Sequence, residues 1–412
     1  MYQLSFIIPM YNEEERIERC IQSIIGSNQN VHLELEILVI DDCSTDCSSE
    51  IVRKMQGENN YISLYSNTCR QGAGYCRNIG LAKAKGFYLW FVDADDYIES
   101  DALSILKEYI LQKKLDVLYF DIKRIDLLQR TAESHMLEIR ETGPLSGKEM
   151  FRKIMEGNRP RVCVGGGLYR TEYINTIKLR FREGYIGEDA YFSLCVLLFA
   201  DVAKYINDPI YVVHKSNNSV TVCTPSAERF LGFFFAFCDM MGCFVSLNDS
   251  SLSSDLLNYI TPYWRHAKSY FRFEDRDFIE SEIKKQQESI RLMYDFFMGI
   301  EYGNTYQDEV NPHILKDIKR SGTVIIYGAG AVAKEMALVL NSIDKPVLAY
   351  AVSSLKDNPK SIYGVPVIHI NDLLCHREEA LVVIATLPNQ YKKIKDYLYS
   401  LGFQHVIGLL ER

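Results

Sequence analysis

Two aspartates lie close together at the end of an apolar segment. The segment from Phe87 to Asp96 reads FYLWFVDADD, so one residue separates Asp93 from Asp95. Two carboxylates this close repel each other unless a cation or hydrogen-bond donors compensate their charge. Mg²⁺ and Mn²⁺ take oxygen ligands from carboxylates and phosphates, so the pair suits a metal ion held against a phosphate. A solvated loop that caps the next helix is the alternative that this motif alone leaves open.

Two other segments carry groups that suit a nucleotide. The run VIDDCSTD contains Asp41 and Asp42, and a carboxylate there can accept an N–H of a base, whereas Ser44 or Asp46 caps the next helix. The run QGAGYCRN enters a helix, where glycines allow close backbone approach and the helix N-terminus favours an anion. Arg77, in the same run, can add a charge-assisted contact to phosphate.

Alternating strand and helix signals position these groups. Apolar strands are predicted at 4–9, 33–42, 61–67, 87–96 and 116–121, with helices at 12–25, 48–56, 101–113 and from the glycine loop to residue 85. Apolar strands separated by helices indicate a parallel sheet covered on both faces. The chemistry of such sheets lies at the carboxyl ends of the strands. The predicted fold class is therefore α/β, with a mixed, mainly parallel sheet.

The rest of the chain suggests a helical extension and a second small α/β domain. Residues 147–220 are mixed, with a turn at Gly165–Gly167 and a helix starting near Glu188. Helices are predicted over 225–300, a linker over 301–318, and then strands at 323–328, 346–352, 380–386 and 405–409 with helices at 331–342 and 389–401. The predicted domains are 1–222, 223–318 and 319–412.

The overall composition excludes several classes of protein. The 412 residues are 47% hydrophobic and 24% charged, which excludes a disordered or fibrous chain. The net charge of −8 disfavours a general nucleic-acid binder. The 11 cysteines show no zinc-binding spacing and fit reduced cytosolic thiols. We expect no signal peptide, because no charged segment followed by a long apolar core begins the chain.

The most apolar stretch has three open interpretations. Residues 230–247 read FLGFFFAFCDMMGCFVSL, with Asp239 near the middle. The stretch suits a buried helix, a helix lying in a membrane interface, or a span of minimum length.

Four motifs together carry a family resemblance. The runs PMYNEEERIERCIQSI, VIDDCSTD, GAGYCRNIGLAKAKG and FVDADD follow in an order and spacing that resembles the family 2 glycosyltransferases, over roughly residues 1–220. Gly167–Arg170 resembles the acceptor-side turn of that family, and Gly187-Glu188-Asp189 resembles its catalytic Glu–Asp pair. The resemblance implies a GT-A fold and an inverting transfer from a nucleotide-activated sugar.

The resemblance also implies individual roles. Asp189 would be the general base, with Glu188 the next candidate, and Asp95 would hold Mn²⁺ or Mg²⁺ against the diphosphate. Residues assigned to the nucleotide sugar are Pro9, Tyr11, Asn12, Glu13, Asp41, Asp42, Gly72, Arg77, Asp93 and Ala94, with Pro9, Tyr11 and Asp42 around the base and ribose. Metal ligands would be Asp95, Asp93 and His214, although a structural or acceptor-side role for His214 stays open.

The expected partners follow from the same resemblance. The donor would be a nucleotide sugar, by default a UDP-sugar, and the acceptor a glycan or lipid-linked glycan of a bacterial surface polysaccharide. We expect a cytoplasmic protein with peripheral contact at the inner membrane face. Its C-terminal domain is expected either to dock on the transferase or to mediate self-association. The alternatives are a bifunctional enzyme whose C-terminal domain performs NAD(P)- or nucleotide-dependent sugar chemistry, and a non-catalytic sugar-nucleotide sensor.

The C-terminal domain carries a glycine motif of its own. The run from Gly328 to Ala333 has the GxGxx[GA] form of a dinucleotide-binding turn. That fingerprint needs an acid near the end of the second strand, where Ser353 and Ser354 stand instead. NAD is therefore not expected as a cofactor. The segment resembles a Rossmann-like module of bacterial capsule and sugar-modifying proteins, for which a structural or regulatory role is expected.

Overall fold

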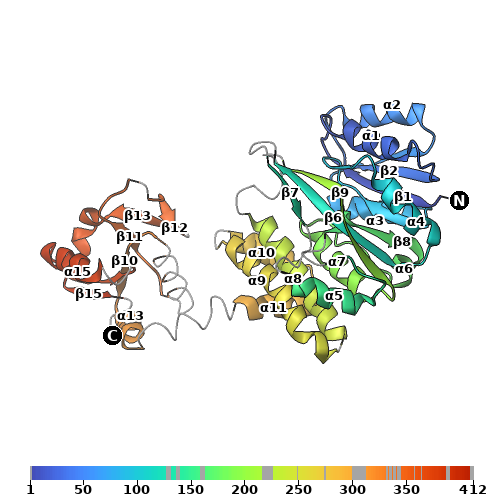
Figure 1. The fold of residues 1–412 in the computed structure, drawn as a ribbon. Coiled ribbons are helices and arrows are strands. Elements are labelled where there is room, and N and C mark those ends of the chain that lie inside the picture. The colour runs from blue at the N-terminus through green and yellow to red at the C-terminus, as the bar shows by residue number, and fades with distance from the viewer. Residues whose placement is uncertain are drawn as a thin grey trace. The chain divides into compact units, whose positions relative to one another are not determined.

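The structure is a computed structural model of the chain, and it divides into two compact units, Met1–Phe271 and Arg272–Arg412 (Figure 1). It describes residues 2–126, 131–135, 140–157, 163–215, 226–247, 249–272, 275–298, 312–330, 333, 336, 340, 345–356, 358–362, 364–386 and 390–408. The predicted helix at 331–342 and most of the predicted linker at 301–318 lie outside these residues. The three-domain division stays a prediction.

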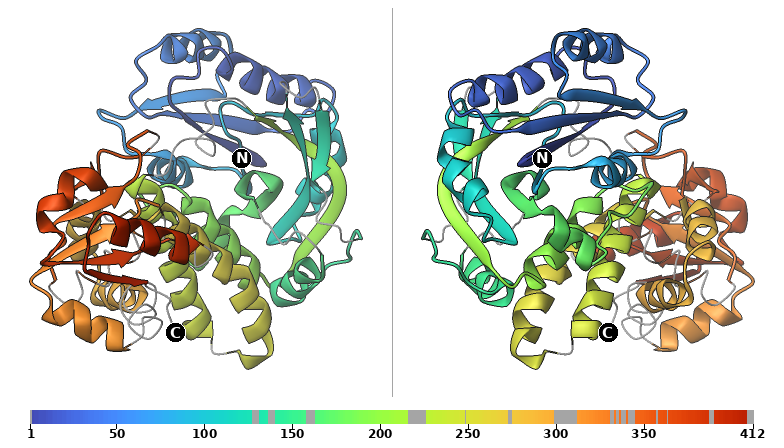
Figure 2. Two further views of the ribbon diagram at one scale, coloured as in Figure 1. Left: turned by 90° about the vertical axis from the view of Figure 1, so that its left-hand side faces the viewer. Right: turned by 90° about the vertical axis from the view of Figure 1, so that its right-hand side faces the viewer.

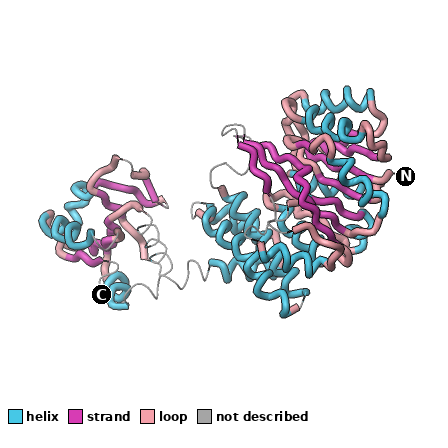
Figure 3. The backbone as a smooth tube through the Cα atoms, in the orientation of Figure 1, coloured by secondary structure: helices cyan, strands magenta, loops and turns pink. Residues whose placement is uncertain are grey.

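A nine-stranded sheet forms the centre of the N-terminal unit. Its strands are β1 (Leu4–Met10), β2 (Leu35–Asp41), β3 (Ile62–Ser66), β4 (Tyr88–Phe91), β5 (Tyr97–Ile98), β6 (Val117–Asp126), β7 (Thr131–His135), β8 (Gly167–Arg170) and β9 (Ala203–Lys215). The order is β3-β2-β1-β4-β8-β6-β9-β5, with β7 beside β6. The strands are drawn in magenta in Figure 3. Strands β1 to β4 are parallel, whereas β8 is antiparallel to β4 and β6. The predicted α/β class with a mixed, mainly parallel sheet is confirmed.

Helices cover both faces of this sheet (Figure 2). They are α1 (Ile17–Asn28), α2 (Ser48–Glu58), α3 (Ala73–Lys83), α4 (Ala102–Gln112), α5 (Gly147–Glu156), α6 (Thr171–Thr176), α7 (Glu188–Leu198), α8 (Ala227–Leu247) and α9 (Ser253–Tyr270), with the short 3₁₀ turns η1 (Val164–Gly166) and η2 (Ser250–Leu252). Side chains alternate along each strand. Phe6 and Ile8 therefore pack against α1, α2 and α4, whereas Ile7 packs into the core formed with α3, α5 and α7.

Two local predictions differ from the structure. Gly165 and Gly166 lie in a turn as predicted, namely η1, whereas Gly167–Arg170, which was likened to an acceptor-side turn, forms strand β8. The buried side chains of Leu168 and Tyr169 explain this, because they complete the sheet between β4 and β6. The predicted first helix begins at Ile17 instead of residue 12, because the backbone before it bonds to another loop.

The apolar stretch forms α8, which packs against α7 and α9. Phe230, Phe234 and Phe235 are buried. On α9, Phe233 stacks on Tyr270 and Phe237 packs edge-to-face against Trp264. By length and apolar composition α8 is the one described helix able to cross a membrane. Its packing supports the buried-helix interpretation, and contact with a membrane stays a prediction.

A second, smaller sheet lies in the C-terminal unit. The elements of this unit are α10 (Arg276–Lys284), α11 (Glu288–Met298), α13 (Pro312–Arg320), β10 (Thr323–Tyr327), β11 (Ala349–Val352), β12 (Ser361–Ile362), β13 (Val365–His369), the 3₁₀ turn η5 (Ile370–His376), β14 (Ala380–Ile384), α15 (Tyr391–Ser400) and β15 (His405–Gly408). The strand order is β12-β13-β11-β10-β14-β15, and all neighbours except β12 and β13 pair in parallel. Helix α13 occupies the end of the predicted linker.

Candidate active site

The sheet order brings three of the predicted segments to one edge. Strand β1 lies between β2 and β4, and all three run in the same direction. The backbone continues this pairing beyond the strands, because Asp42 N–H donates to the Met10 carbonyl at 2.8 Å and Val92 N–H donates to the Ile7 carbonyl at 3.1 Å. Asp42 and Asp93 therefore leave the same edge of the sheet, as the sequence predicts.

The loops after β1 and β2 are bonded to each other. Asn12 N–H donates to Ser44 Oγ at 2.9 Å, and Thr45 N–H donates to Asn12 Oδ1 at 2.8 Å. Asn12 has a φ of 53°, which an asparagine tolerates better than most side chains. Asp41 is buried and accepts from Ser44 N–H at 3.0 Å and from Ser49 Oγ at 2.5 Å. In this structure Asn12 and Asp41 therefore hold the loops, and their predicted contact with a nucleotide stays a prediction.

Glu13 and Tyr11 lie in the first of these loops. Glu13 N–H donates to Ser48 Oγ at 2.7 Å, and its carboxylate pairs with Arg16 at 2.7 Å. Burial raises the pKa of Glu13 to about 7 in spite of Arg16. The guanidinium of Arg70 lies 4.2 Å from the centre of the Tyr11 ring, a cation–π contact. Tyr11 is half-buried, as is Pro9 at the end of β1, so both can still take part in a binding surface.

Asp42 organises the glycine loop. Its carboxylate is buried and accepts from Asn67 Nδ2 at 2.8 Å, from Gln71 N–H at 2.8 Å and from Gly72 N–H at 2.7 Å. Gly72 has a φ of 89° and precedes α3, so it needs the conformational freedom of glycine. The amide of Gly72 therefore serves Asp42 in this structure, although the sequence predicts it beside the nucleotide sugar.

Arg77 joins two predicted parts of the site. Its guanidinium donates to Asp93 Oδ1 at 2.7 Å and also to the carboxylate of Glu188. The side chain is only 5% exposed. Burial alone would lower the pKa of Arg77, but Asp93 and Glu188 outweigh it and raise that pKa, so the guanidinium stays charged. These carboxylate partners were not predicted, and a contact of Arg77 with phosphate stays a prediction.

The loop after β4 concentrates negative charge. The Asp93 side chain is 41% exposed. Burial and the charge of Asp93 raise the pKa of Asp95, and burial raises that of Asp96 further still. Asp96 is buried and accepts from Tyr211 Oη at 2.6 Å. Ala94 is 3% exposed and packs in the core, so its side chain anchors the loop between the two predicted ligands.

His214 reaches this loop through its backbone. Its N–H donates to Asp96 Oδ1 at 2.9 Å, while its buried Nδ1 has no hydrogen-bond partner among the described residues. Burial and the positive charge of Arg19 lower the pKa of His214, which favours a neutral ring. Within the part of the chain that the structure describes, no group of three or more histidine, cysteine or acidic side chains is arranged to hold a metal. Asp93, Asp95 and His214 are therefore not brought together as one set of ligands.

Asp189 lies at the start of α7, beside the residues that Arg77 joins. Gly187 has a φ of 76° and caps this helix, which places Glu188 and Asp189 in its first turn. Burial and the charge of Glu188 raise the pKa of Asp189 to about 6. The pKa of the nearby Cys163 thiol is raised to about 12, first by burial of the thiol and then by the negative charge of Asp189.

Sequence reasoning missed three groups that shape this site. Asp96 and Tyr211 support the acidic loop, because Tyr211 Oη also accepts from Asp93 N–H at 3.1 Å. Gly165 makes room for this tyrosine, since a Cβ at Gly165 would lie 2.7 Å from the Tyr211 ring. The signals in the sequence were Asp96 at the end of the acidic run and a tyrosine within a strand, and neither is specific.

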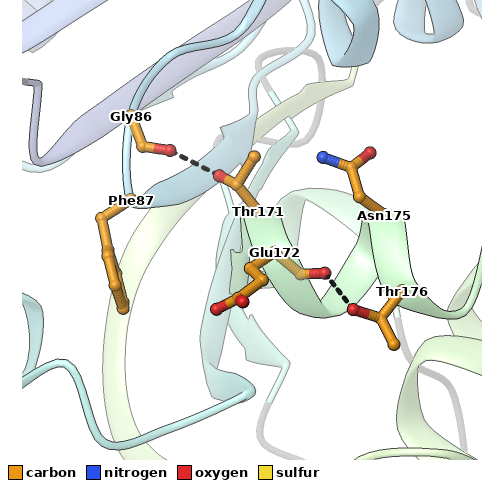
Figure 4. Close-up of a pocket in the computed structure, with 6 residues that line it drawn as sticks. All are labelled: Gly86, Phe87, Thr171, Glu172, Asn175 and Thr176. Carbon is orange, nitrogen blue, oxygen red and sulfur yellow. Dashed lines mark hydrogen bonds between the residues drawn. The ribbon is translucent and has the colours of Figure 1, made fainter.

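A separate hollow lies at the opposite end of β4 (Figure 4). It is lined by Gly86, Phe87, Thr171, Glu172, Asn175 and Thr176. Thr171 Oγ1 donates to the Gly86 carbonyl at 2.5 Å across it. None of the predicted site residues lines this hollow.

Comparison with known proteins shows what the N-terminal unit is similar to. Residues 5–177 match the family described as Glycosyl transferase family 2. The uncharacterized glycosyltransferase EpsJ of Bacillus subtilis (strain 168) is 29% identical over 221 residues, which are 53% of this chain and 62% of EpsJ. Glycosyltransferase GlyA of Streptococcus pneumoniae serotype 4 is 27% identical over 224 residues, which are 53% of this chain and 31% of GlyA. The matched region thus spans less than two thirds of either relative.

A solved structure shows the same fold. The crystal structure of S. aureus TarS 1–349 in complex with UDP-GlcNAc aligns with a TM-score of 0.52 and 21% identity, covering 69% of this chain and 80% of that one. At this identity the likeness concerns the fold. Residues 5–177 are thus similar to the family 2 glycosyltransferases, and the N-terminal unit has a mixed α/β fold of the GT-A type.

Proposed function

We propose that the protein is an inverting glycosyltransferase that moves a sugar from a nucleotide-sugar donor to a hydroxyl of a glycan or lipid-linked glycan. One observation carries the proposal. Arg77 pairs with Asp93 after β4 and with Glu188 at the start of α7. Arg77 thereby links the predicted donor side to Glu188, which precedes the predicted base Asp189 in the first turn of α7, and a direct transfer requires the two sides to lie close together.

A UDP-sugar is the proposed donor. TarS was solved with UDP-GlcNAc, and a stretch of 126 residues of this chain is 34% identical to TarS, which is a poly(ribitol-phosphate) beta-N-acetylglucosaminyltransferase. The half-buried Pro9 and Tyr11, with Arg70 over the tyrosine ring, offer a flat surface beside the strand edge. Such surfaces suit a planar base.

A divalent cation, Mg²⁺ or Mn²⁺, is the proposed cofactor. Asp93 and Asp95 fit it, because burial and the charge of Asp93 raise the pKa of Asp95, and a bound cation would relieve that unfavourable charge. His214 is not needed for this assignment, since the structure does not bring it together with the two aspartates. The cation would neutralise charge on the leaving diphosphate. Water and phosphate oxygens would supply the other ligands.

Asp189 is the proposed general base. A carboxylate with a pKa of about 6 is ionised at neutral pH and still accepts a proton readily. Asp189 takes the proton of the acceptor hydroxyl as the oxygen attacks the anomeric carbon and the bond to the diphosphate breaks. Attack from the face opposite the leaving group inverts that carbon. Arg77 stays charged and holds Glu188 beside the base.

The acceptor and the cellular site are further parts of the proposal. The family relation to bacterial enzymes supports a role in surface polysaccharide synthesis, with the protein in the cytoplasm and in peripheral contact with the membrane. Nothing in the charge of the chain favours nucleic acid. We assign self-association to the C-terminal unit.

A Rossmann-like architecture is proposed for that unit. Its parallel strands have the order β13-β11-β10-β14-β15, which is the order 3-2-1-4-5 of this fold. Gly328 follows β10 with a φ of 127°, and a Cβ there would lie 2.7 Å from the Ala385 carbonyl oxygen. Ser353 stands where NAD-binding domains have an acid, so a bifunctional NAD-dependent enzyme remains the less favoured alternative.

A donor-hydrolysis screen tests the proposed function. Purified full-length protein is incubated with UDP-, GDP- and dTDP-sugars in the presence of Mn²⁺, and release of the nucleoside diphosphate is measured. We expect release from UDP-sugars, its loss with EDTA, and its loss in Asp189→Asn. Binding of a sugar nucleotide without any turnover would favour the sensor alternative instead.

A further inference from the structure

The segment Phe181–Gly187, which leads into α7, is bonded to helix α3. Phe181 N–H donates to Asn78 Oδ1 at 2.9 Å, and Asn78 Nδ2 donates to the Phe181 carbonyl at 2.9 Å. Gly74 lies so close that a Cβ there would be 2.3 Å from the Arg182 carbonyl oxygen. One side of the segment is therefore fixed to the helix that follows the glycine loop.

Helix α8 holds the other side of the same segment. Arg182 forms a two-pronged ion pair with Asp239, with Nε to Oδ2 at 2.7 Å and an Nη to Oδ1 at 2.8 Å. Its guanidinium also lies 4.7 Å from the centre of the Phe235 ring. About one turn before Phe235 in α8, Gly232 also lies against the segment, because a Cβ there would be 2.3 Å from the Ile186 carbonyl oxygen. Two of these close approaches need glycine, so the backbone has little freedom to shift.

The segment 181–187 ends two residues before the proposed base, Asp189. Gly187 caps α7, and Asp189 lies in the first turn of that helix. A displacement of 181–187 would therefore move Asp189 relative to α3, which carries Arg77. Geometry at this point matters, because a misplacement of about 1 Å can cost about 100-fold in rate.

We propose that Arg182 and Asp239 are positioning residues of the transferase, which hold Asp189 at its working distance from the donor side by fixing the segment 181–187 between α3 and α8. The proposal rests on the proposed function. It also gives a reason for a carboxylate in the middle of an apolar helix. Asp239 is 21% and Arg182 is 22% exposed, so water only partly replaces the pair when it is broken.

A purely structural role is the competing explanation. An ion pair at this depth stabilises α8 whether or not it positions anything. The two roles differ in what they predict for kinetics. If the pair is only structural, breaking it lowers the melting temperature and the amount of active enzyme. If the pair positions Asp189, breaking it also lowers the turnover of each folded molecule.

Asp239→Asn is the first test, with Asp249→Asn as its matched control. The control makes the same chemical change just beyond the end of α8 and breaks the ion pair of Asp249 with Lys148, whose N–O distance is also 2.7 Å. For Asp239→Asn we expect kcat per folded molecule to fall about tenfold or more, with the donor KM within about twofold of wild type. For Asp249→Asn we expect both values to stay at the wild-type level.

The charge swap Arg182→Asp/Asp239→Arg is the second test. It should restore a substantial part of the kcat that Asp239→Asn loses, and it should slow the amide exchange of 181–187, which Asp239→Asn is expected to accelerate. Equal kcat in the Asp239→Asn and Asp249→Asn variants would overturn the proposal, as would faster exchange of 181–187 without loss of kcat. If wild type itself shows no turnover while it binds UDP, the proposed function fails. The exchange measurement then still tests whether the Arg182–Asp239 pair fixes the segment 181–187.

Discussion

Replacing Asp189 by asparagine should sharply lower turnover and should make the protein more stable than wild type by an amount that grows as the pH rises to neutrality. Asparagine keeps the shape of the side chain but cannot take a proton. We expect turnover to fall by at least about 100-fold, the scale of a lost general base, with nucleotide affinity nearly unchanged. The gain in stability arises because burial and Glu188 oppose the ionised form of Asp189.

The size of this gain follows from the raised pKa. In the unfolded chain Asp189 ionises near the ordinary value of 3.8, and in the folded protein at about 6. The folded state therefore holds the proton more tightly, and the stability that this group contributes below the lower pKa is lost as pH rises through the higher one. The contribution of Asp189 to the free energy of unfolding falls by about 3 kcal/mol over the whole titration, and about 2 kcal/mol of this is lost between about pH 4 and about pH 7.

Tryptophan fluorescence can follow this effect in the N-terminal unit alone. The chain has 2 tryptophans, Trp90 in β4 and Trp264 in α9, and both belong to Met1–Phe271. The melting temperature of Asp189→Asn should exceed that of wild type by an amount that grows by about 5 °C between about pH 4 and about pH 7. The acid limb of the kcat profile of wild type should fall below about pH 6, as the base becomes protonated.

The control should respond in the opposite direction. The hydrogen bond from Lys148 lowers the pKa of Asp249 to about 2, so this group contributes stability above the ordinary aspartate pKa. Asp249→Asn should thus lose stability relative to wild type as pH rises. If the difference in melting temperature between Asp189→Asn and wild type stayed constant with pH, the conclusion that Asp189 is ionised while buried would be refuted. Normal turnover would move the base elsewhere, with Glu188 the first candidate.

Three further predictions concern the donor and the C-terminal unit. Asp95→Ala should abolish metal-dependent UDP binding in calorimetry, and Asp93→Ala should leave weak binding; full activity of both with EDTA present would disprove the metal site. Asp42→Ala leaves the amides of Gln71 and Gly72 without their acceptor, so UDP affinity should fall about tenfold, whereas unchanged affinity would mean that the glycine loop does not contact the donor. NAD titrated into the full chain should bind weakly, and a Kd of about 1 μM or better, near −8 kcal/mol, would revive the bifunctional alternative.

The sequence was most informative where chemistry depends on strand ends. Buried strands are apolar throughout, so the first polar residues after them stand out, and parallel strands bring their ends to one edge. Asp42 and Asp93 were found in this way, and the glycine loop was found from its permissive residues. The helix caps Gly72 and Gly187 agree with this, since both have positive φ values that local sequence can signal.

The sequence was least informative where a side chain is satisfied from far along the chain. Tyr211 bonds to Asp96 across 115 positions, and Arg77 bonds to Glu188 across 111. Periodicity and spacing describe neighbours within a helix turn or a strand repeat, so they do not report such pairs. Arg77 shows the consequence, because a cation beside a glycine loop gives no sign of the carboxylates that reach it from other elements.

Asp239 is another residue whose partner lies far along the chain, and it bears on whether α8 is a buried helix or one that contacts a membrane. Within its own helix the residue is a charge that interrupts an apolar stretch, and both a buried helix and an interfacial helix remain open on that basis. Its partner Arg182 lies 57 positions earlier, on the segment that leads to Asp189. Separating a carboxylate paired in this way from its cation is costly, and the attraction within the pair offsets part of the cost of burying both charges. The charge in α8 is therefore explained by what the helix holds in place, and the aromatic residues around it are explained by the rings of α9 against which they pack.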